Sequence, residues 1–272
     1  MTVPGTTVAI SLKMYFTGAR TFEYCRSLAD LADRDPGVRS GSTDLIVLPT
    51  FIWLSAALGA VRDSKVHIGA QDLATEDSGA FTGEVSGAEL AEIGCTHVEV
   101  GHAERRSLFH ETDTIVAAKT QAAFRHGLIP ILCVGEPTRT NPMTAAELCT
   151  RELLSAVTTA QGDSEPPDRM IIAYEPLWAI GAAQPAPSSY VAEVCQRVRI
   201  ALADQLRDFA IIYGGSAGPG LLTDLGTSVD GLFLGRFAHD PGAVAAVLSE
   251  ATLRREHQSA QILPDPHPDS KT

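Results

Sequence analysis

The stretch MIIAYEPLWAIG, residues 170–181, carries the strongest structural signal in this chain. A short apolar run, typical of a strand, leads directly into Glu175 and then into Pro176. Small residues follow, among them Ala179 and Gly181, and they favour a loop that can move. A carboxylate at a strand end beside a mobile loop suits a general base. Taken alone, the motif also fits a strand-end glutamate paired with a surface arginine.

The same pattern, an apolar run followed by polar residues, occurs eight times along the chain. The runs are nearly continuous in apolar residues, as expected for strands that are covered on both faces. Helix-like stretches lie between them. Eight strand–helix units over about 250 residues predict an α/β fold, a (β/α)8 barrel of eight parallel strands with outer helices. The runs are TVAIS (7–11), DLIVLP (44–49), VHIGAQ (66–71), THVEVG (96–101), LIPILCVGE (128–136), MIIAYEP (170–176), FAIIYGG (209–215) and DGLFLGR (230–236).

Three helix starts can be predicted from capping signals. SGAE (86–89) and TAAE (144–147) have the spacing of a capping box, and Asp240-Pro241 combines a cap with a proline in the first helical position. We expect residues 1–252 to form a single barrel domain. Residues 253–272, with three prolines and few apolar residues, are predicted to form a disordered tail.

The composition argues against several classes of protein. The chain has 272 residues, of which 44% are hydrophobic and 20% charged, enough for one large core. Its net charge of −12 disfavours nucleic acid as a partner. No apolar run has membrane-spanning length, and no signal peptide is evident, so we expect no membrane association. Five cysteines without a CxxC pair favour a reducing, cytoplasmic location.

Polar residues with chemical potential follow several of the predicted strands. Lys13 follows the first strand, His102 the fourth and Glu175 the sixth. The glycine-rich segments YGGSAGPG (213–220) and LFLGR (232–236) end the seventh and eighth strands, and their free amides could cradle a phosphate. Each feature alone could be a surface lysine, a loop histidine or a tight turn. Together they lie on the face where such barrels place their active sites.

The same residues indicate what kind of chemistry to expect. A candidate base and an imidazole occur without a His/Asp cluster at metal-ligand spacing, which favours a proton transfer without metal or cofactor. The sequence lacks GxGxxG after the first strand and lacks GxxxxGK[ST], so the main signals for dinucleotide and nucleoside-triphosphate binding are missing.

Six motifs together resemble the triosephosphate isomerase family, in its order and near its spacing, over roughly residues 6–250. They are LKM (12–14), GAFTGE (79–84), GHAERR (101–106), CVGE (133–136), AYEPLWAIG (173–181) and YGGS (213–216). The resemblance implies a TIM barrel that interconverts glyceraldehyde 3-phosphate and dihydroxyacetone phosphate through an enediolate. It further implies a cytoplasmic enzyme of glycolysis and gluconeogenesis that uses no cofactor.

The resemblance also assigns expected roles to individual residues. Glu175 would be the base, His102 the neutral electrophile that polarises the carbonyl, Lys13 the positive charge near the substrate oxygens and Glu104 a supporting carboxylate. Thr82 would lie at the tip of a loop that enters the partner's active site in a homodimer. The residues expected to present amides to the phosphate are Gly181, Ser216 and Gly235.

The chain departs from the family pattern at four places. Ser11-Leu12 stands where the family usually has Asn-Trp, and Ala103 stands where it has serine. Residues 181–183 read Gly-Ala-Ala in place of Gly-Thr-Gly, and Arg236 replaces a second glycine after the eighth strand. An arginine there could bind phosphate with two parallel hydrogen bonds or reshape the pocket rim. Ser11 and Arg236 are therefore added to the predicted substrate-binding residues.

Two of these departures define the main alternative substrate. A branch that isomerises L-erythrulose 1-phosphate to D-erythrulose 4-phosphate is similar to this chain in having Ser before the lysine motif and Gly-Arg after strand eight. Triose phosphate is the first expectation and the four-carbon ketose phosphate the second. A catalytically silent phosphate-binding barrel and a Schiff-base aldolase using Lys13 remain alternatives, although a carboxylate in the sixth strand position disfavours the aldolase.

Overall fold

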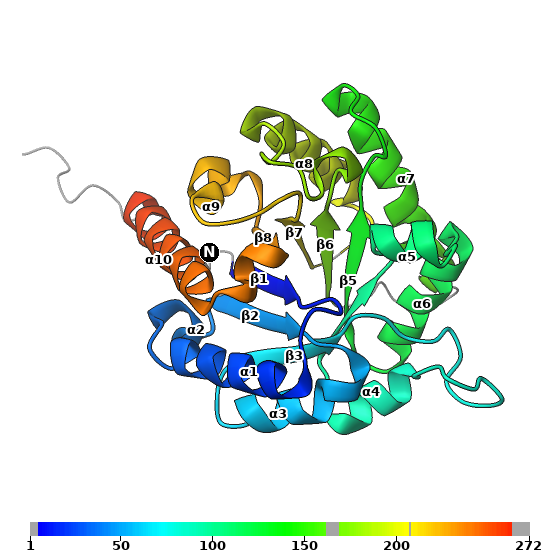
Figure 1. Cartoon of the computed structure of the whole chain (residues 1–272). Coiled ribbons are helices and arrows are strands. Elements are labelled where there is room, and N and C mark those ends of the chain that lie inside the picture. The colour runs from blue at the N-terminus through cyan, green and yellow to red at the C-terminus, as the bar shows by residue number, and fades with distance from the viewer. Residues whose placement is uncertain (1–4, 162–168, 207, 263–272) are drawn as a thin grey trace, which may run out of the picture.

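The computed structural model describes residues 5–161, 169–206 and 208–262. Eight strands pair in parallel in the order of the sequence, and β1 closes on β8. Figure 1 shows these strands in the centre with the helices around them. The predicted (β/α)8 barrel is confirmed. The strands are β1 (Thr6–Ser11), β2 (Thr43–Leu48), β3 (Val66–Ala70), β4 (His97–Val100), β5 (Ile129–Val134), β6 (Met170–Tyr174), β7 (Phe209–Tyr213) and β8 (Gly231–Leu234).

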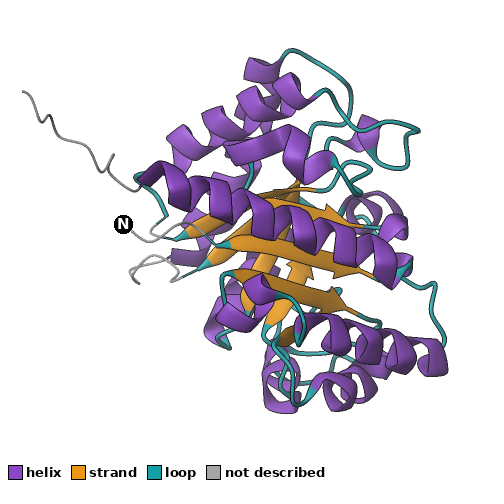
Figure 2. Ribbon diagram, turned by 90° about the vertical axis from the view of Figure 1, so that its left-hand side faces the viewer, coloured by secondary structure: helices purple, strands orange, loops and turns teal. Residues whose placement is uncertain are grey.

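Helices cover the outside of the barrel, as the side view in Figure 2 also shows. The α-helices are α1 (Gly18–Ala32), α2 (Pro36–Ser40), α3 (Leu54–Val61), α4 (Gly87–Ile93), α5 (Ala103–Leu108), α6 (Asp113–Arg125), α7 (Pro142–Gln161), α8 (Ser188–Leu202), α9 (Leu221–Leu225) and α10 (Pro241–Ile262). Single turns of 3₁₀ helix are η1 (Phe51–Trp53), η2 (Leu177–Ala179), η3 (Gly226–Ser228) and η4 (Arg236–His239).

Successive strand residues face two different cores. On β1, Val8 and Ile10 belong to the core shared with the helices, whereas Ala9 belongs to a second core inside the barrel. Burial on both faces explains why the strand sequences are continuously apolar. The interior core consists of Ala9, Ile46, Leu48, Ile131, Cys133, Ile171, Ala173, Ile212 and Phe233.

One of the two predicted capping boxes is present in the structure and the other is not. Helix α4 begins after Ser86, and the reciprocal bonds between Ser86 and Glu89 are both present, as predicted. The second capping box is wrong. Helix α7 already begins at Pro142, and the Asn141 side chain accepts the N–H of Thr144 at 3.0 Å, so Thr144 lies inside the helix. Asparagine at the cap and proline in the first helical position form the stronger signal.

The last helix corrects the predicted domain boundary. Helix α10 begins at Pro241 as expected, and the Gly242 N–H donates to Asp240 Oδ1 at 2.9 Å. It continues to Ile262, so the prediction of a tail starting at residue 253 is wrong. Residues 253–262 contain no glycine or proline to end the helix, and the first proline of this region is at position 264. Residues 263–272 lie outside the described part of the chain.

Two further sequence features can be compared with the structure. Within the described ranges, none of the helices is both long enough and apolar enough to cross a membrane. All five cysteines are buried and carry free thiols.

Candidate active site

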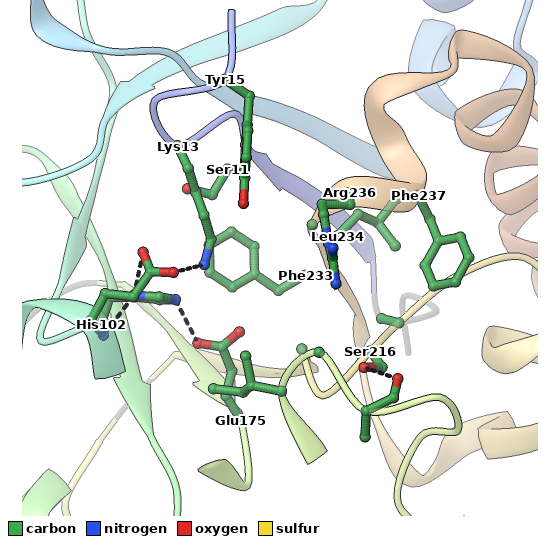
Figure 3. A pocket seen from close by; sticks show the side chains of 17 residues that line it. Ser11, Lys13, Tyr15, His102, Glu175, Ser216, Phe233, Leu234, Arg236 and Phe237 are labelled. Carbon is green, nitrogen blue, oxygen red and sulfur yellow. Dashed lines mark hydrogen bonds and ion pairs between the residues drawn. The ribbon is translucent and has the colours of Figure 1, made fainter. Parts of the chain in front are cut away.

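A cavity of about 630 Å³ opens at the carboxyl ends of the strands. It is lined by residues that follow β1, β4, β6, β7 and β8, so segments far apart in the sequence meet there (Figure 3). The structure brings together all the site residues predicted from the sequence. These are Ser11, Lys13, His102, Glu104, Glu175, Gly181, Ser216, Gly235 and Arg236.

Glu175 lies directly after β6, where the strand leads it to the floor of the cavity. Its backbone N–H donates to Val134 O at 2.8 Å, which continues the pairing of β5 with β6. The side chain is buried, and its Oε2 atom has no hydrogen-bond partner. Ala103 provides no hydroxyl that could bind it. A Cβ atom at Gly214 would clash with the Glu175 carboxylate, so the glycine makes room for this conformation.

His102 faces Glu175 from the N-terminus of α5. Its Nδ1 atom accepts the N–H of Glu104 at 3.1 Å, so the ring proton is on Nε2. The Nε2 atom lies 3.6 Å from Glu175 Oε2 (Figure 3). A carboxylate and a hydrogen-bond donor are thereby directed to the same point, an arrangement that suits removal of a proton next to a carbonyl group.

Lys13 supplies the positive charge at this end of the cavity. Its φ angle of +46° is uncommon for a residue other than glycine, and such conformations often occur at functional sites. Gln71 supports the turn because its Nε2 atom donates to Lys13 O at 3.0 Å. The ammonium group lies 2.6 Å from Glu104 Oε1, on the rim of the cavity. Glu104 therefore fixes the position of the lysine side chain.

One end of the loop after Glu175 is anchored by Glu136, which was not among the predicted site residues. Glu136 is fully buried at the end of the run that contains β5. It accepts hydrogen bonds from Trp178 Nε1 at 2.7 Å and from the hydroxyls of Tyr174 and Tyr190. A charged residue that ends an apolar run, as in LIPILCVGE, was the available sequence signal.

The other end of this loop is held by the segment that follows β7. Ser216 Oγ donates to the carbonyl oxygens of Ala179 and Ala182 at 2.8 and 3.0 Å. Gly181 has a φ angle of +69°, which favours glycine. Arg236 projects into the cavity opposite Lys13 and, within the described residues, makes no ion pair (Figure 3). Its charge is therefore available to an anionic ligand.

A second buried carboxylate, Glu99 on β4, was also missed by the sequence analysis. Its Oε2 atom accepts the hydroxyl proton of Ser11 at 2.9 Å, and its Oε1 atom lies 4.0 Å from His102 Nε2. Burial raises the pKa of Glu99 to about 7, although the nearby His102 works in the opposite direction. The sequence signal that could have identified Glu99 was a charged residue in the middle of the apolar run THVEVG.

The described residues contain no group of three or more His, Cys, Asp or Glu side chains arranged to hold a metal ion. The polar groups that line the cavity include the Glu175 carboxylate, the His102 imidazole N–H and the cationic side chains of Lys13 and Arg236. They are suited to binding an anion and moving a proton.

The profile of the triosephosphate isomerase family matches residues 6–251, which is nearly the whole described chain. The chain belongs to the triosephosphate isomerase family. The family resemblance expected from the motifs is confirmed, and the protein is an enzyme that isomerises sugar phosphates.

Members of this family with different names are similar to the chain. An L-erythrulose-1-phosphate isomerase from Pectobacterium atrosepticum is 50% identical over 247 residues, covering 90% of this chain and 95% of the relative. A triosephosphate isomerase from Alkalilimnicola ehrlichii is 40% identical over 252 residues, covering 90% and 97%. An L-erythrulose-1-phosphate isomerase from Rhizobium rhizogenes is 35% identical over 254 residues, covering 91% and 95%. The comparisons therefore show the family, whereas the names of these relatives differ in the sugar phosphate that they mention.

Proposed function

We propose that this enzyme isomerises L-erythrulose 1-phosphate to D-erythrulose 4-phosphate. The observation that carries the proposal is the 50% identity to a relative of that name over nearly the full length of both chains. Two side chains in the cavity support it. Ser11 and Arg236 both line the cavity, and they occupy the two positions at which the four-carbon branch resembles this chain.

The arrangement of Glu175 and His102 supports an enediolate mechanism. The Glu175 carboxylate removes the proton from C3, and the electron pair forms a C2–C3 double bond while the C2 oxygen becomes negative. His102 Nε2–H and the Lys13 ammonium stabilise that oxygen. The hydroxyl proton then moves from the C3 oxygen to the C2 oxygen. Glu175 finally returns its proton to C2, which leaves the carbonyl group at C3.

The phosphate would bind on the opposite side of the cavity. Gly181, Ser216 and Gly235 can direct backbone amides to it, and Arg236 adds a guanidinium group that binds phosphate well. The loop at residues 176–183 would exclude water during the reaction, which matters because an exposed enediolate phosphate can eliminate its phosphate. Glu104 would release Lys13 to the substrate on binding.

Triose phosphate is the second candidate substrate. The 40% identity to a named triosephosphate isomerase and the intact Glu175, His102 and Lys13 support it. Glycolysis and gluconeogenesis would be the corresponding pathways. The five buried free thiols support a reducing compartment, and we propose a cytoplasmic location. The aldolase alternative is disfavoured because Lys13 is paired with Glu104 and is not buried away from water.

We further propose that the enzyme is a homodimer in which the GAFTGE loop reaches the partner's site. The segment between β3 and α4 extends away from the barrel (Figure 1). Phe81 in this segment is 48% exposed, and Thr82 beside it is also exposed. A large apolar side chain at the tip of a projecting loop suits a protein interface.

The proposed substrate can be tested by measuring turnover of L-erythrulose 1-phosphate and dihydroxyacetone phosphate side by side with the purified protein. We expect kcat/KM for the four-carbon substrate to be at least about tenfold higher, because a site built to bind an additional hydroxyl group discriminates against a substrate that lacks it. A higher value for the triose would support the second candidate. No turnover of either substrate would support a silent barrel.

A further inference from the structure

Glu99 occupies a position where the barrel would be expected to carry an apolar side chain. Its backbone pairs with Ile131 on β5, and Ile131 and Cys133 belong to the apolar core inside the barrel. The Glu99 side chain is only 4% exposed. Within the described residues, no lysine or arginine nitrogen lies within 4.0 Å of its carboxylate. A buried charge without such a partner destabilises the fold, so stability does not explain this residue.

The hydrogen bond from Ser11 connects Glu99 to the cavity. Ser11 lines the cavity, whereas Glu99 lies behind it and is not part of the lining. Ser11 has a single hydroxyl proton, and that proton is directed to Glu99 Oε2 at 2.9 Å. Only the lone pairs of the Ser11 oxygen remain for a ligand. While Glu99 Oε2 accepts this proton, Ser11 can act only as an acceptor toward a ligand, and the group that it recognises is a donor such as a hydroxyl.

The position of Ser11 indicates which substrate group it would meet. Figure 3 shows Ser11 beside Lys13, on the side of the cavity away from Ser216. The chain Ser11–Glu99–His102, with separations of 2.9 and 4.0 Å, places Ser11 near the reacting end. With phosphate bound near Ser216 and Arg236, the end of the substrate that is remote from the phosphate points toward Ser11.

We propose that Ser11, oriented by Glu99, accepts a hydrogen bond from the terminal hydroxymethyl group of a four-carbon ketose phosphate. Aligned on its phosphate and carbonyl group, a triose phosphate ends at the carbon that corresponds to C3, so it has no C4 hydroxymethyl group for Ser11 to bind. Ser11 is thus a specificity residue that contacts the substrate, and Glu99 is a positioning residue that acts through it. The inference rests on the proposed function and adds to it the part of the site that distinguishes four carbons from three.

A different role for Glu99 makes a different prediction. If Glu99 acted mainly on His102, its loss would slow both substrates equally, because both need the same electrophile. The distance of 4.0 Å from Glu99 Oε1 to His102 Nε2 is too long for a hydrogen bond, and Glu175 lies closer to that nitrogen at 3.6 Å. The ratio of the two kcat/KM values separates the two roles.

The experiment compares Ser11→Ala, Glu99→Leu and Glu99→Gln with the wild type on both substrates. We expect Ser11→Ala and Glu99→Leu each to lower the ratio of kcat/KM for L-erythrulose 1-phosphate to that for dihydroxyacetone phosphate on the order of 10- to 100-fold. Glu99→Gln should retain most of the ratio, because its amide oxygen can still accept the Ser11 proton. The double variant should be no worse than the larger single change, since both remove the same interaction.

Two control variants test whether any polar loss has this effect. Glu111→Gln changes another buried carboxylate, which binds Lys119 and Arg105, and Ser64→Ala removes a hydroxyl that donates to Val61 O. Neither residue lines the cavity. Both controls should keep the wild-type ratio, and thermal unfolding measurements should establish that each variant is folded. If Glu99→Leu does not fold, the ratio of the two kcat/KM values measured for Ser11→Ala tests the inference by itself.

The outcomes distinguish this inference from the proposed function. Wild-type turnover of the four-carbon substrate with an unchanged ratio in Ser11→Ala, or with a parallel loss for both substrates, would overturn the inference alone. A wild type that uses only the triose would overturn the proposed function and this inference with it.

Discussion

His102 Nε2 and Glu175 Oε2 lie 3.6 Å apart at the floor of one cavity, and both side chains are buried. Residues separated by 73 positions along the chain thus face the same small volume. The Glu175 oxygen has no hydrogen-bond partner, and the His102 nitrogen carries the ring proton. A substrate in the cavity can therefore place a carbon against Glu175 and the neighbouring carbonyl oxygen against His102.

Shortening the base should reduce the rate strongly. Glu175→Asp withdraws the carboxylate by about 1 Å, and we expect kcat to fall on the order of 100-fold or more, with a smaller change in KM. Glu193→Asp, a matched change on the exposed face of α8, should have no effect. Steady-state kinetics on either substrate measures this effect, and nearly full activity of Glu175→Asp would rule out Glu175 as the base.

Treatment of the wild type with a chelator should not reduce its activity.

Removing the guanidinium group of Arg236 should weaken phosphate binding. Because the side chain lines the cavity without an acidic partner among the described residues, we expect Arg236→Gly mainly to raise KM, by roughly 5- to 150-fold. The inhibition constant of inorganic phosphate should rise with it. Arg62→Gly on the surface after α3 is the control. If Arg236 instead shapes the rim for a longer substrate, the ratio of four-carbon to triose turnover will change. Unchanged KM and an unchanged ratio would show that it does neither.

Stability should depend on pH through Glu99. Its folded pKa of about 7 is raised from 4.5, so the folded state binds this proton more tightly than the unfolded state. The free energy of unfolding should therefore be higher below pH 4.5 as far as this group is concerned, and should fall as pH rises to about 7. The full change is on the order of 3 kcal/mol.

The contribution of Glu99 can be isolated by comparing urea unfolding of the wild type and Glu99→Gln between these pH values. The titratable groups that face Glu99 are His102, Glu175, Lys13 and Cys133. They remain in both proteins, so the difference between the two curves reports mainly on Glu99. The difference should grow in favour of the variant as pH rises, and a constant difference would show that Glu99 titrates normally.

The homodimer should be required for activity. Sedimentation velocity is expected to show a dimer at assay concentrations, and specific activity should fall as dilution produces monomers. Thr82→Arg at the tip of the projecting loop should weaken association and lower activity together. A monomer that keeps full activity at low concentration would contradict the proposed role of this loop.

Much of the fold and site could be predicted because each feature depended on local sequence. The strands are continuous apolar runs. Glu175 directly follows a strand end, and one residue separates Lys13 and His102 from theirs. Parallel strands in a closed barrel bring all their carboxyl ends to one face. The sequence positions of these residues were therefore enough to predict that they share one site.

The features that were missed depended on contacts across the barrel or on competing local signals. Ser11 and Glu99 are separated by 88 positions, and their contact depends on which face each strand presents to the interior. The start of α7 was misplaced because Asn141 and Pro142 competed with an apparent capping box. The end of α10 was misplaced because polar composition suggested a tail where no residue interrupts the helix.

The central claim is most directly tested by incubating L-erythrulose 1-phosphate with the wild-type enzyme in D₂O and following the reaction by ¹H and ¹³C NMR. We predict D-erythrulose 4-phosphate with deuterium at its C3, which is the carbon numbered C2 in the substrate. The deuterium enters because Glu175 exchanges its proton with solvent while the enediolate exists. Glu175→Gln should give neither product nor exchange. Absence of the four-carbon product from an enzyme that turns over triose phosphate would contradict the proposed substrate. A four-carbon product without deuterium, in a reaction that goes to completion over many turnovers, would contradict the proposed proton transfer.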